Sequence, residues 1–215
     1  MKTIVANKPV AIYKAIEFLV LFIFIPVSYA FEYNPIIKGC IGLAGFIYLI
    51  YILLKVEKIS FKINRGLDWP RFWQTTLVKL GLIIFITCLY VYLVAPDKLF
   101  NVLLNKPKLY VIILFVYAFF SVYPQEVLYR TFFFNRYEQF FTSKYQIVFI
   151  NAIIFSLAHI FLKNMLVAVL TFVGGLLFAY TYYNERSTLM VSVEHAIYGS
   201  WLFTVGMGDM LAFPS

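Results

Sequence analysis

Apolar runs about as long as a membrane is thick recur along this chain, and they limit the folds open to it more than any motif does. The hydrocarbon core of a bilayer is about 30 Å thick and takes roughly 20 helical residues to cross. Hydrophobic residues make up 63% of the 215 positions and charged residues only 13%, about half the charged share of a typical soluble domain. We therefore expect an all-α fold, a polytopic membrane helical bundle.

Eight apolar segments are long enough, or nearly so, to be transmembrane helices. Pro124 separates the fourth from the fifth, because the residue before a proline disfavours helical geometry and a proline is tolerated in a first turn. The predicted segments are residues 10–31, 35–54, 73–96, 109–123, 124–141, 146–162, 164–183 and 187–205. No internal repeat or second domain interrupts them, so residues 1–215 are predicted to form a single membrane domain.

The longest hydrophilic connection, Lys55 to Arg71, holds five basic and two acidic residues. Cytoplasmic loops are rich in Lys and Arg, so this connection is predicted to be cytoplasmic, together with both termini. The same alternation places Glu126 and His159 near the cytoplasmic ends of their helices, Lys163 inside and Lys144 outside. If the fifth segment is re-entrant instead, every later segment inverts.

The formal net charge of +8 does not indicate nucleic-acid binding. The basic residues lie mostly in short stretches between apolar runs, where cytoplasmic loops and anionic lipid headgroups account for them. No basic block with interleaved aromatic residues is present. We expect membrane lipid as a partner and no nucleic acid.

A few ionisable residues lie inside the apolar runs, where each is costly unless it is paired or faces water. Long side chains near a segment end can reach the membrane surface. We interpret Lys14, Glu17 and Lys79 in this way, and Arg136 and Glu138 as well.

Glu126 and Arg130 differ from these residues because they lie four positions apart and so share one helical face. One interpretation is a purely structural pair that joins two helices. His159 and His195, the only histidines of the chain, lie in two other apolar segments, where a single histidine is more often structural than catalytic. One carboxylate, one arginine and both histidines on three helices that share an interior favour a functional site.

These groups suffice for the hydrolysis of an amide bond by water. Desolvation and a nearby cation shift the pKa of a carboxyl group in opposite directions, which can hold it in the range useful for moving a proton. A histidine can donate to an oxygen that becomes negative when a carbonyl is attacked, or carry a second proton. Hydrolysis by a metal-bound water would use the same side chains as ligands. No HExxH pattern is present, however, and we expect no bound metal or other cofactor.

The order and spacing of these residues resemble a known family. Gln125 to Arg130 reads QExxxR, Phe155 to His159 reads FxxxH, and His195 follows in a late apolar segment. These resemble the three motifs of the CAAX protease and bacteriocin-processing family, also called the Abi family, which includes the type II CAAX prenyl endopeptidases. The resemblance covers about residues 123–201. It implies an eight-helix intramembrane endopeptidase, in a bacterial inner membrane, that acts on a membrane-associated or lipidated peptide.

The resemblance also implies functions for single residues. A glutamate of the first motif activates water, His159 assists it, and His195 stabilises the oxyanion together with an asparagine one turn later. The chain departs from this pattern twice, because the usual paired glutamates read Gln125-Glu126 and because Gly199 stands at the asparagine position.

Given these departures, Glu126 is the candidate base and Gln125 a group that positions water or the carbonyl. Arg130 and Phe155 support the site through their motifs. Ser200 or a backbone amide is the candidate replacement for the donor that Gly199 lacks.

Two other functions stay open at this stage. A catalytically silent member of the family would bind such peptides as an immunity or regulatory factor, because Gln125 cannot take a proton at neutral pH. Proton-coupled transport would use the buried glutamate and histidines as a relay, but the two halves lack the repeated pair of broken helices that indicates a transporter. The identity of the substrate and the oligomeric state are not predicted.

Overall fold

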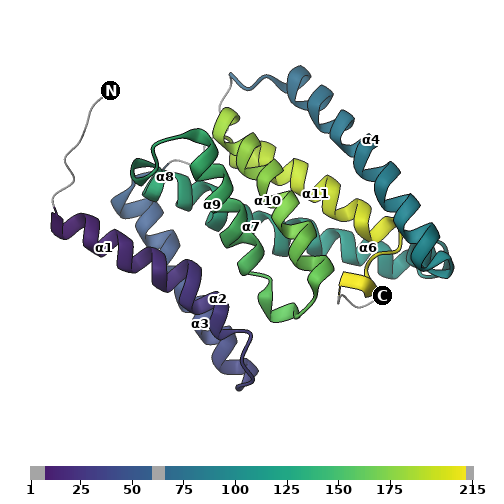
Figure 1. Cartoon of the computed structure of the whole chain (residues 1–215), viewed down its shortest axis with the longest axis horizontal. Coiled ribbons are helices and arrows are strands. Elements are labelled where there is room, and N and C mark those ends of the chain that lie inside the picture. The colour runs from purple at the N-terminus through teal and green to yellow at the C-terminus, as the bar shows by residue number, and fades with distance from the viewer. Residues whose placement is uncertain (1–7, 60–65, 212–215) are drawn as a thin grey trace. The chain divides into compact units, whose positions relative to one another are not determined.

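The structure is a computed structural model that describes residues 8–59 and 66–211 (Figure 1). Both termini and residues 60–65 of the basic connection lie outside this range, so the sidedness expected for them stays a prediction. All regular structure within the described residues is helical, which confirms the predicted all-α fold.

The helical elements follow the apolar runs, and several short elements join end to end into longer segments. In chain order they are α1 (Lys8–Leu19), η1 (Val20–Phe24), α2 (Ile25–Ser28), α3 (Pro35–Tyr51), η2 (Ile52–Val56), α4 (Trp69–Val94), η3 (Pro96–Lys98), α5 (Asn101–Asn105), α6 (Pro107–Val116), η4 (Tyr117–Val122), α7 (Tyr123–Glu126), η5 (Val127–Phe132), α8 (Phe133–Tyr137), η6 (Glu138–Phe140), α9 (Lys144–Leu157), η7 (Ile160–Leu162), α10 (Met165–Glu185), α11 (Thr188–Thr204) and η8 (Asp209–Leu211).

Six helical segments of the described chain are long and apolar enough to cross a membrane. They are Pro9–Ser28, Pro35–Val56, Trp69–Val94, Pro107–Phe140, Lys144–Leu162 and Met165–Glu185. The helix α11 is shorter, at 17 residues. Large apolar side chains such as Leu82, Phe85 and Leu93 of α4 are exposed, as expected for surfaces that face lipid. The chain is a multi-pass membrane protein, although the predicted number of eight spans is not reproduced.

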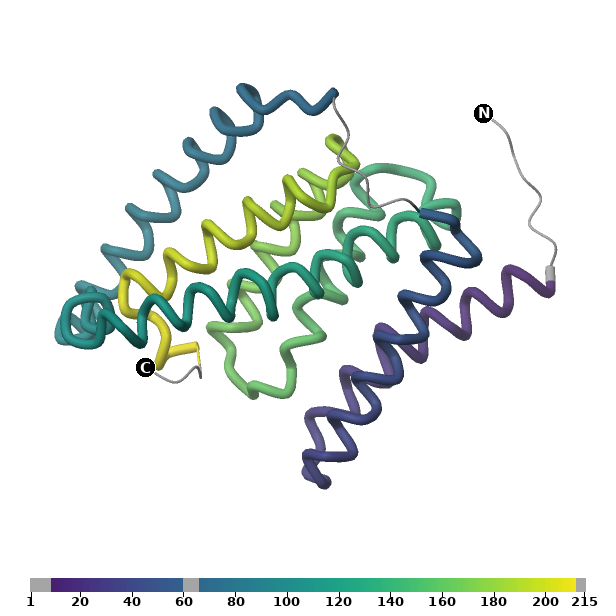
Figure 2. Tube along the Cα trace, turned by 180° about the vertical axis from the view of Figure 1, so that it is seen from behind, coloured from purple at the N-terminus to yellow at the C-terminus, as the bar shows by residue number. Residues whose placement is uncertain are grey.

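The predicted break at Pro124 is wrong, because Pro107–Phe140 is one continuous helical segment of 34 residues, which we call the long helix. Figure 2 shows it as an unbroken run from teal to green. A proline removes one N–H and crowds the carbonyl four residues before it. Here the preceding turn, η4, is π-helical, and the N–H of Tyr123 bonds to the carbonyl of Ala118, five residues back. This wider turn relieves the crowding that the prediction relied on.

The helix starts are well explained by the sequence. Asn34 caps α3, where its side chain accepts a hydrogen bond from the N–H of Ile36 at 2.9 Å and a proline takes the first helical position. Ser143 and Ser187 cap α9 and α11 in the same manner. Such caps satisfy backbone N–H groups that the first turn leaves without partners.

The chain packs as two compact units. The first unit comprises Met1–Ser60 and Phe132–Gly175, and the second comprises Phe61–Thr131 and Leu176–Ser215. The long helix and α10 each contribute residues to both units. The prediction of a single membrane domain is not tested by this division and stays a prediction.

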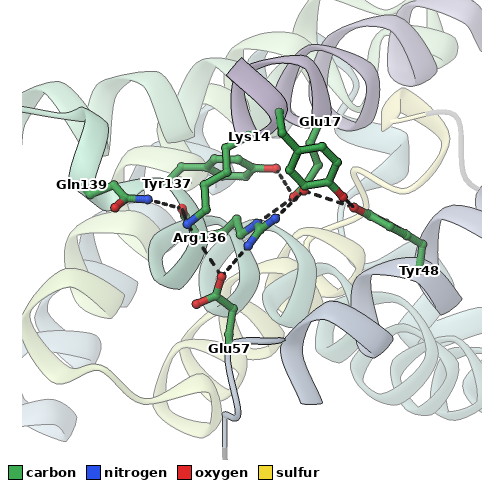
Figure 3. A network of polar contacts seen from close by, with 8 residues as sticks. Lys14, Glu17, Tyr48, Glu57, Arg136, Tyr137 and Gln139 are labelled. Carbon is green, nitrogen blue, oxygen red and sulfur yellow. Dashed lines mark hydrogen bonds and ion pairs between the residues drawn. The ribbon is translucent and has the colours of Figure 1, made fainter. Parts of the chain in front are cut away.

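A buried ion-pair network holds the first unit together. The guanidinium of Arg136 binds both oxygens of Glu17, at 3.0 and 2.7 Å, and its third nitrogen lies 2.8 Å from Glu57 Oε1. The hydroxyl of Tyr137 donates to Glu17 at 2.8 Å and that of Tyr48 does so at 3.1 Å. Figure 3 shows the guanidinium of Arg136 between the two carboxylates. Glu17 and Arg136 were predicted to reach the membrane surface; they are buried instead, because each satisfies the charge of the other.

Contacts at the helix ends of the first unit bear on the predicted sidedness. Lys14 Nζ lies 3.9 Å from Glu57 Oε1 and donates to the carbonyl of Arg136 at 3.2 Å, so the beginning of α1 and the ends of η2 and α8 lie together. Lys163 lies beside Glu32, at 3.7 Å, at the opposite end of the first span. The sequence placed Lys163 on the side of the amino terminus. Lys163 and Glu32 were expected on opposite sides of the membrane, so their contact favours one crossing by the long helix over two.

The second unit is built around α11. The hydroxyl of Tyr198 donates to the carbonyl of Thr76 at 3.1 Å, and the indole N–H of Trp201 donates to the hydroxyl of Thr87 at 2.8 Å. These bonds attach α11 to α4, and the two helices run side by side in Figure 1. On another side, α11 packs against η4 and α7 of the long helix. This packing brings the late histidine to the first motif.

Candidate active site

The predicted acid and one of the predicted histidines meet in the second unit. Glu126, at the end of α7, places Oε1 2.7 Å from Nδ1 of His195 on α11. Its other oxygen, Oε2, lies 3.3 Å from Nε of Arg130, one turn further along the long helix. The side chains of Glu126 and Arg130 are fully buried, and that of His195 is only 7% exposed. Three of the predicted site residues therefore form one buried cluster.

Burial of these charges is tolerated because they are paired. A lone carboxylate in a low-dielectric interior is costly, whereas an ion pair with additional hydrogen bonds recovers much of that cost. The spacing of four residues places Glu126 and Arg130 on one helical face, with the glutamate on the favourable amino-terminal side. The signal in the sequence was therefore sufficient to predict this contact.

Phe178 on α10 belongs to the cluster, although sequence reasoning missed it. Its ring stacks on the imidazole of His195, with centroids 4.3 Å apart and an angle of 21° between the planes. The guanidinium carbon of Arg130 lies 5.7 Å from the same ring, within reach of a cation–π interaction. Phe178 limits the rotation of His195. The chain has 24 phenylalanines, and nothing in the sequence distinguishes Phe178 from the others.

The bond to Glu126 fixes which nitrogen of His195 is free to act as a base. An ionised carboxylate accepts hydrogen bonds only, so Nδ1 carries the hydrogen and donates it to Glu126. In the neutral ring the lone pair is then on Nε2. A carboxylate that orients an imidazole in this way also stabilises the imidazolium that forms when Nε2 takes a proton.

His159 lies in the first unit, at the end of α9. Its N–H bonds to the carbonyl of Ser156, and its ring Nδ1 lies 2.8 Å from the carbonyl oxygen of Phe155. Side chains often satisfy the last carbonyls of a helix in this manner. A carbonyl only accepts, so Nδ1 carries the hydrogen and Nε2 of the neutral ring carries the lone pair. The FxxxH spacing therefore sets the tautomer of His159, while its predicted place beside Glu126 stays a prediction.

The two positions that depart from the motif pattern differ in their surroundings. The amide nitrogen of Gln125 donates to the hydroxyl of Ser121 at 2.8 Å, one turn earlier on the long helix. Gly199 has no room for a side chain, because an added Cβ would overlap the hydroxyl oxygen of Tyr117. Ser200 has no described side-chain contact with the Glu126–His195 pair; its carbonyl accepts a bond from Thr204.

Glu194, next to His195 in the chain, binds other partners than Glu126. Its Oε1 lies 2.8 Å from Nζ of Lys79 on α4 and accepts a hydrogen bond from Tyr198 at 3.0 Å. Consecutive residues of a helix point about 100° apart, so α11 presents its two adjacent ionisable residues to different neighbours. Lys79 was predicted to reach the membrane surface, and its pairing with a buried carboxylate corrects that interpretation.

No three His, Cys, Asp or Glu side chains within the described ranges gather as metal ligands would. The expectation that no metal binds stays a prediction.

Comparison with known families points to the same residues. A family model described as type II CAAX prenyl endopeptidase Rce1-like matches residues 107–201. Over these residues the chain is similar to that family. The Rce1-like region covers a little under half of the chain and contains all three motifs. The match begins at Pro107, the first residue of the long helix. It therefore includes residues before position 123, where the resemblance based on the motifs begins. No curated protein and no solved structure matches the chain significantly.

The match confirms the resemblance seen in the sequence and points to a membrane-embedded protease of the CAAX type with a peptide substrate. It assigns no function to individual residues. The functions of Glu126, His159 and His195 are therefore matters for the proposal that follows.

Proposed function

We propose that this protein is an intramembrane endopeptidase that hydrolyses a peptide bond in a membrane-associated or lipidated peptide. The observation that carries the proposal is the hydrogen bond of 2.7 Å between Glu126 and His195, buried within the Rce1-like region. A carboxylate–imidazole pair is a general-base arrangement that recurs in enzymes of unrelated folds.

His195 receives the proton of the attacking water in this proposal. The side chain of Glu126 is fully buried, and its two oxygens are engaged by His195 and Arg130. Glu126 therefore acts through His195, which it orients and whose positive charge it stabilises, and it does not contact water itself. This assignment differs from the sequence-based hypothesis, in which Glu126 is the base and His195 stabilises the oxyanion.

The steps balance without a further reactant. The oxygen of water forms a bond to the carbonyl carbon of the peptide, and one proton of the water moves to Nε2 of His195. The carbon–nitrogen bond then breaks, and the same proton passes to the leaving nitrogen, which gives a carboxylic acid and an amine. Arg130 stays paired with the carboxylate of Glu126 throughout.

His159 is proposed to assist the attack of water, as the resemblance implies. The bond between its Nδ1 and the carbonyl of Phe155 leaves the lone pair of the neutral ring on Nε2, where it can accept a hydrogen bond from water. Its variant His159→Gln is expected to lower turnover without affecting the Glu126–His195 pair.

Cleavage of defined peptides by the reconstituted protein tests the proposal. Two fluorescence-quenched peptides of the same sequence would be used, one with an S-farnesyl cysteine near its carboxyl end and one without lipid. Wild-type protein is expected to cleave the farnesylated peptide. Glu126→Gln should lower kcat about a thousand- to ten-thousand-fold, because the amide no longer holds the right tautomer of His195.

Glu194→Gln is the matched control. Glu194 is as deeply buried as Glu126 and is also paired with a cation, but it faces α4, so its variant should keep kcat within a few-fold of wild type. Equal turnover by wild type and Glu126→Gln would overturn the proposal. Binding of the farnesylated peptide by wild type without any cleavage would instead identify a catalytically silent peptide-binding protein.

A further inference from the structure

Tyr117 lies beside His195 of the Glu126–His195 pair. It is the first residue of η4, the π-helical turn of the long helix. Gly199 on α11 lies directly against it, since an added Cβ at this glycine would overlap the phenol oxygen and the ring atom that carries it. The hydroxyl group therefore lies where a side chain of residue 199 would begin.

The ring of Tyr117 follows one face of α11. It meets the imidazole of His195 edge-on, with centroids 6.0 Å apart, and the ring of Phe203 at 5.1 Å. His195, Gly199 and Phe203 are spaced four residues apart and so lie in one row along the helix, with neighbouring Cβ atoms about 5–6 Å apart. The Tyr117 hydroxyl is thus placed one helical turn from His195, on the same face.

The hydroxyl of Tyr117 has no hydrogen-bond partner among the described residues, whereas the hydroxyls of Tyr110 and Tyr198 in the same unit are both bonded. The imidazole that this phenol ring meets edge-on is the one whose Nδ1 lies 2.7 Å from the carboxylate of Glu126. A phenol hydroxyl can donate one hydrogen bond, and a hydroxyl without a protein partner beside a buried acid–imidazole pair is available to a ligand.

We propose that the Tyr117 hydroxyl donates a hydrogen bond to the carbonyl oxygen of the substrate as that oxygen becomes negative, an inference that rests on the proposed peptidase activity. A fixed donor aimed at such an oxygen lowers the barrier because it stabilises charge that develops only in the transition state. The phenol keeps its proton, and no bond to Tyr117 forms or breaks. Tyr117 is thereby a catalytic residue that lies outside the three sequence motifs.

The alternative is that Tyr117 only fills the space left by Gly199. Tyr117→Phe separates the two, because it removes the hydroxyl and keeps the ring against His195 and Phe203. Donation to the oxyanion predicts that kcat for the farnesylated quenched peptide falls about a hundred- to a thousand-fold with KM nearly unchanged. A purely space-filling tyrosine predicts that kcat stays within a few-fold of wild type, which would overturn the proposal.

Tyr110→Phe is the matched control. It removes a hydroxyl from the same long helix, one that bonds to Thr204 at 2.8 Å and lies away from His195. We expect kcat of this variant to stay close to that of wild type. If Tyr110→Phe slows cleavage as much as Tyr117→Phe does, loss of any tyrosine hydroxyl from this helix explains the effect and the proposal fails.

A rescue experiment adds a second test. Tyr117→Ala clears the space beside Gly199, and the double variant Tyr117→Ala/Gly199→Asn places an amide donor there. The double variant should turn over at least ten-fold faster than Tyr117→Ala alone; equal rates would count against a donor at this place. Failure of this inference is distinguishable from failure of the peptidase proposal, since in the first case Glu126→Gln still abolishes cleavage and in the second it does not.

Discussion

At the scale of single residues, the chain shows two ways of placing charge in an apolar interior. In the second unit, Glu126 is shared by Arg130 and His195. In the first unit, Arg136 is shared by Glu17 and Glu57. The cluster around Arg136 contains no imidazole, whereas the cluster around Glu126 contains that of His195. We therefore expect the Arg136 network to contribute stability, whereas chemistry is proposed for the Glu126 cluster.

Glu17→Ala tests the stabilising network. The change leaves a buried guanidinium with only one carboxylate partner, and loss of one partner of a buried ion pair typically costs about 3–5 kcal/mol. We expect the free energy of unfolding in mixed micelles to fall by about that amount. Glu32→Ala is the control, since the carboxylate of Glu32 is 95% exposed and its removal should have almost no effect. Equal stability of the two variants would show that the network contributes little.

At the scale of elements, the long helix is the feature that the sequence did not reveal. Pro124 is an ordinary helix-breaking signal, and the π-helical turn that accommodates it depends on how η4 packs against α11. Contacts between residues close in the sequence were predictable. They are the i, i+4 pair of Glu126 with Arg130 and the helix caps at Asn34, Ser143 and Ser187. The contact between Glu126 and His195 joins residues 69 positions apart, so only the motif pattern suggested it.

The course of the long helix gives a prediction about sidedness. If Pro107–Phe140 crosses the membrane once, Thr142 lies on the same side as Lys58, next to the Glu57–Arg136 contact. Single cysteines at these two positions, in a background where Cys40 and Cys88 are replaced by serine, should react with a membrane-impermeant maleimide from the same side. Asn34→Cys, in the connection at the opposite end of the first span, should react from the other side. If Thr142→Cys instead reacts from the same side as Asn34→Cys, the segment 107–140 crosses the membrane twice, as the sequence predicted.

At the scale of the whole molecule, composition and apolar run length were enough to predict a multi-pass helical membrane protein, because both follow from the thickness of the bilayer. The resemblance to the family was predictable from three short motifs, and the match to residues 107–201 confirms that resemblance. The surroundings of the site were less accessible to sequence reasoning. Phe178 and Tyr117 are aromatic residues among many, and only packing shows that they lie against His195.

The central claim is that Glu126 and His195 act as one catalytic unit, and a double-mutant cycle tests it most directly. The value of kcat for the farnesylated quenched peptide would be measured for wild type, Glu126→Gln, His195→Gln and the double variant. Residues that act as a unit are strongly non-additive. We predict that each single variant loses about a thousand-fold or more in kcat and that the double variant is no slower than the slower single one. Losses that multiply in the double variant, or single variants that turn over like wild type, would contradict the account.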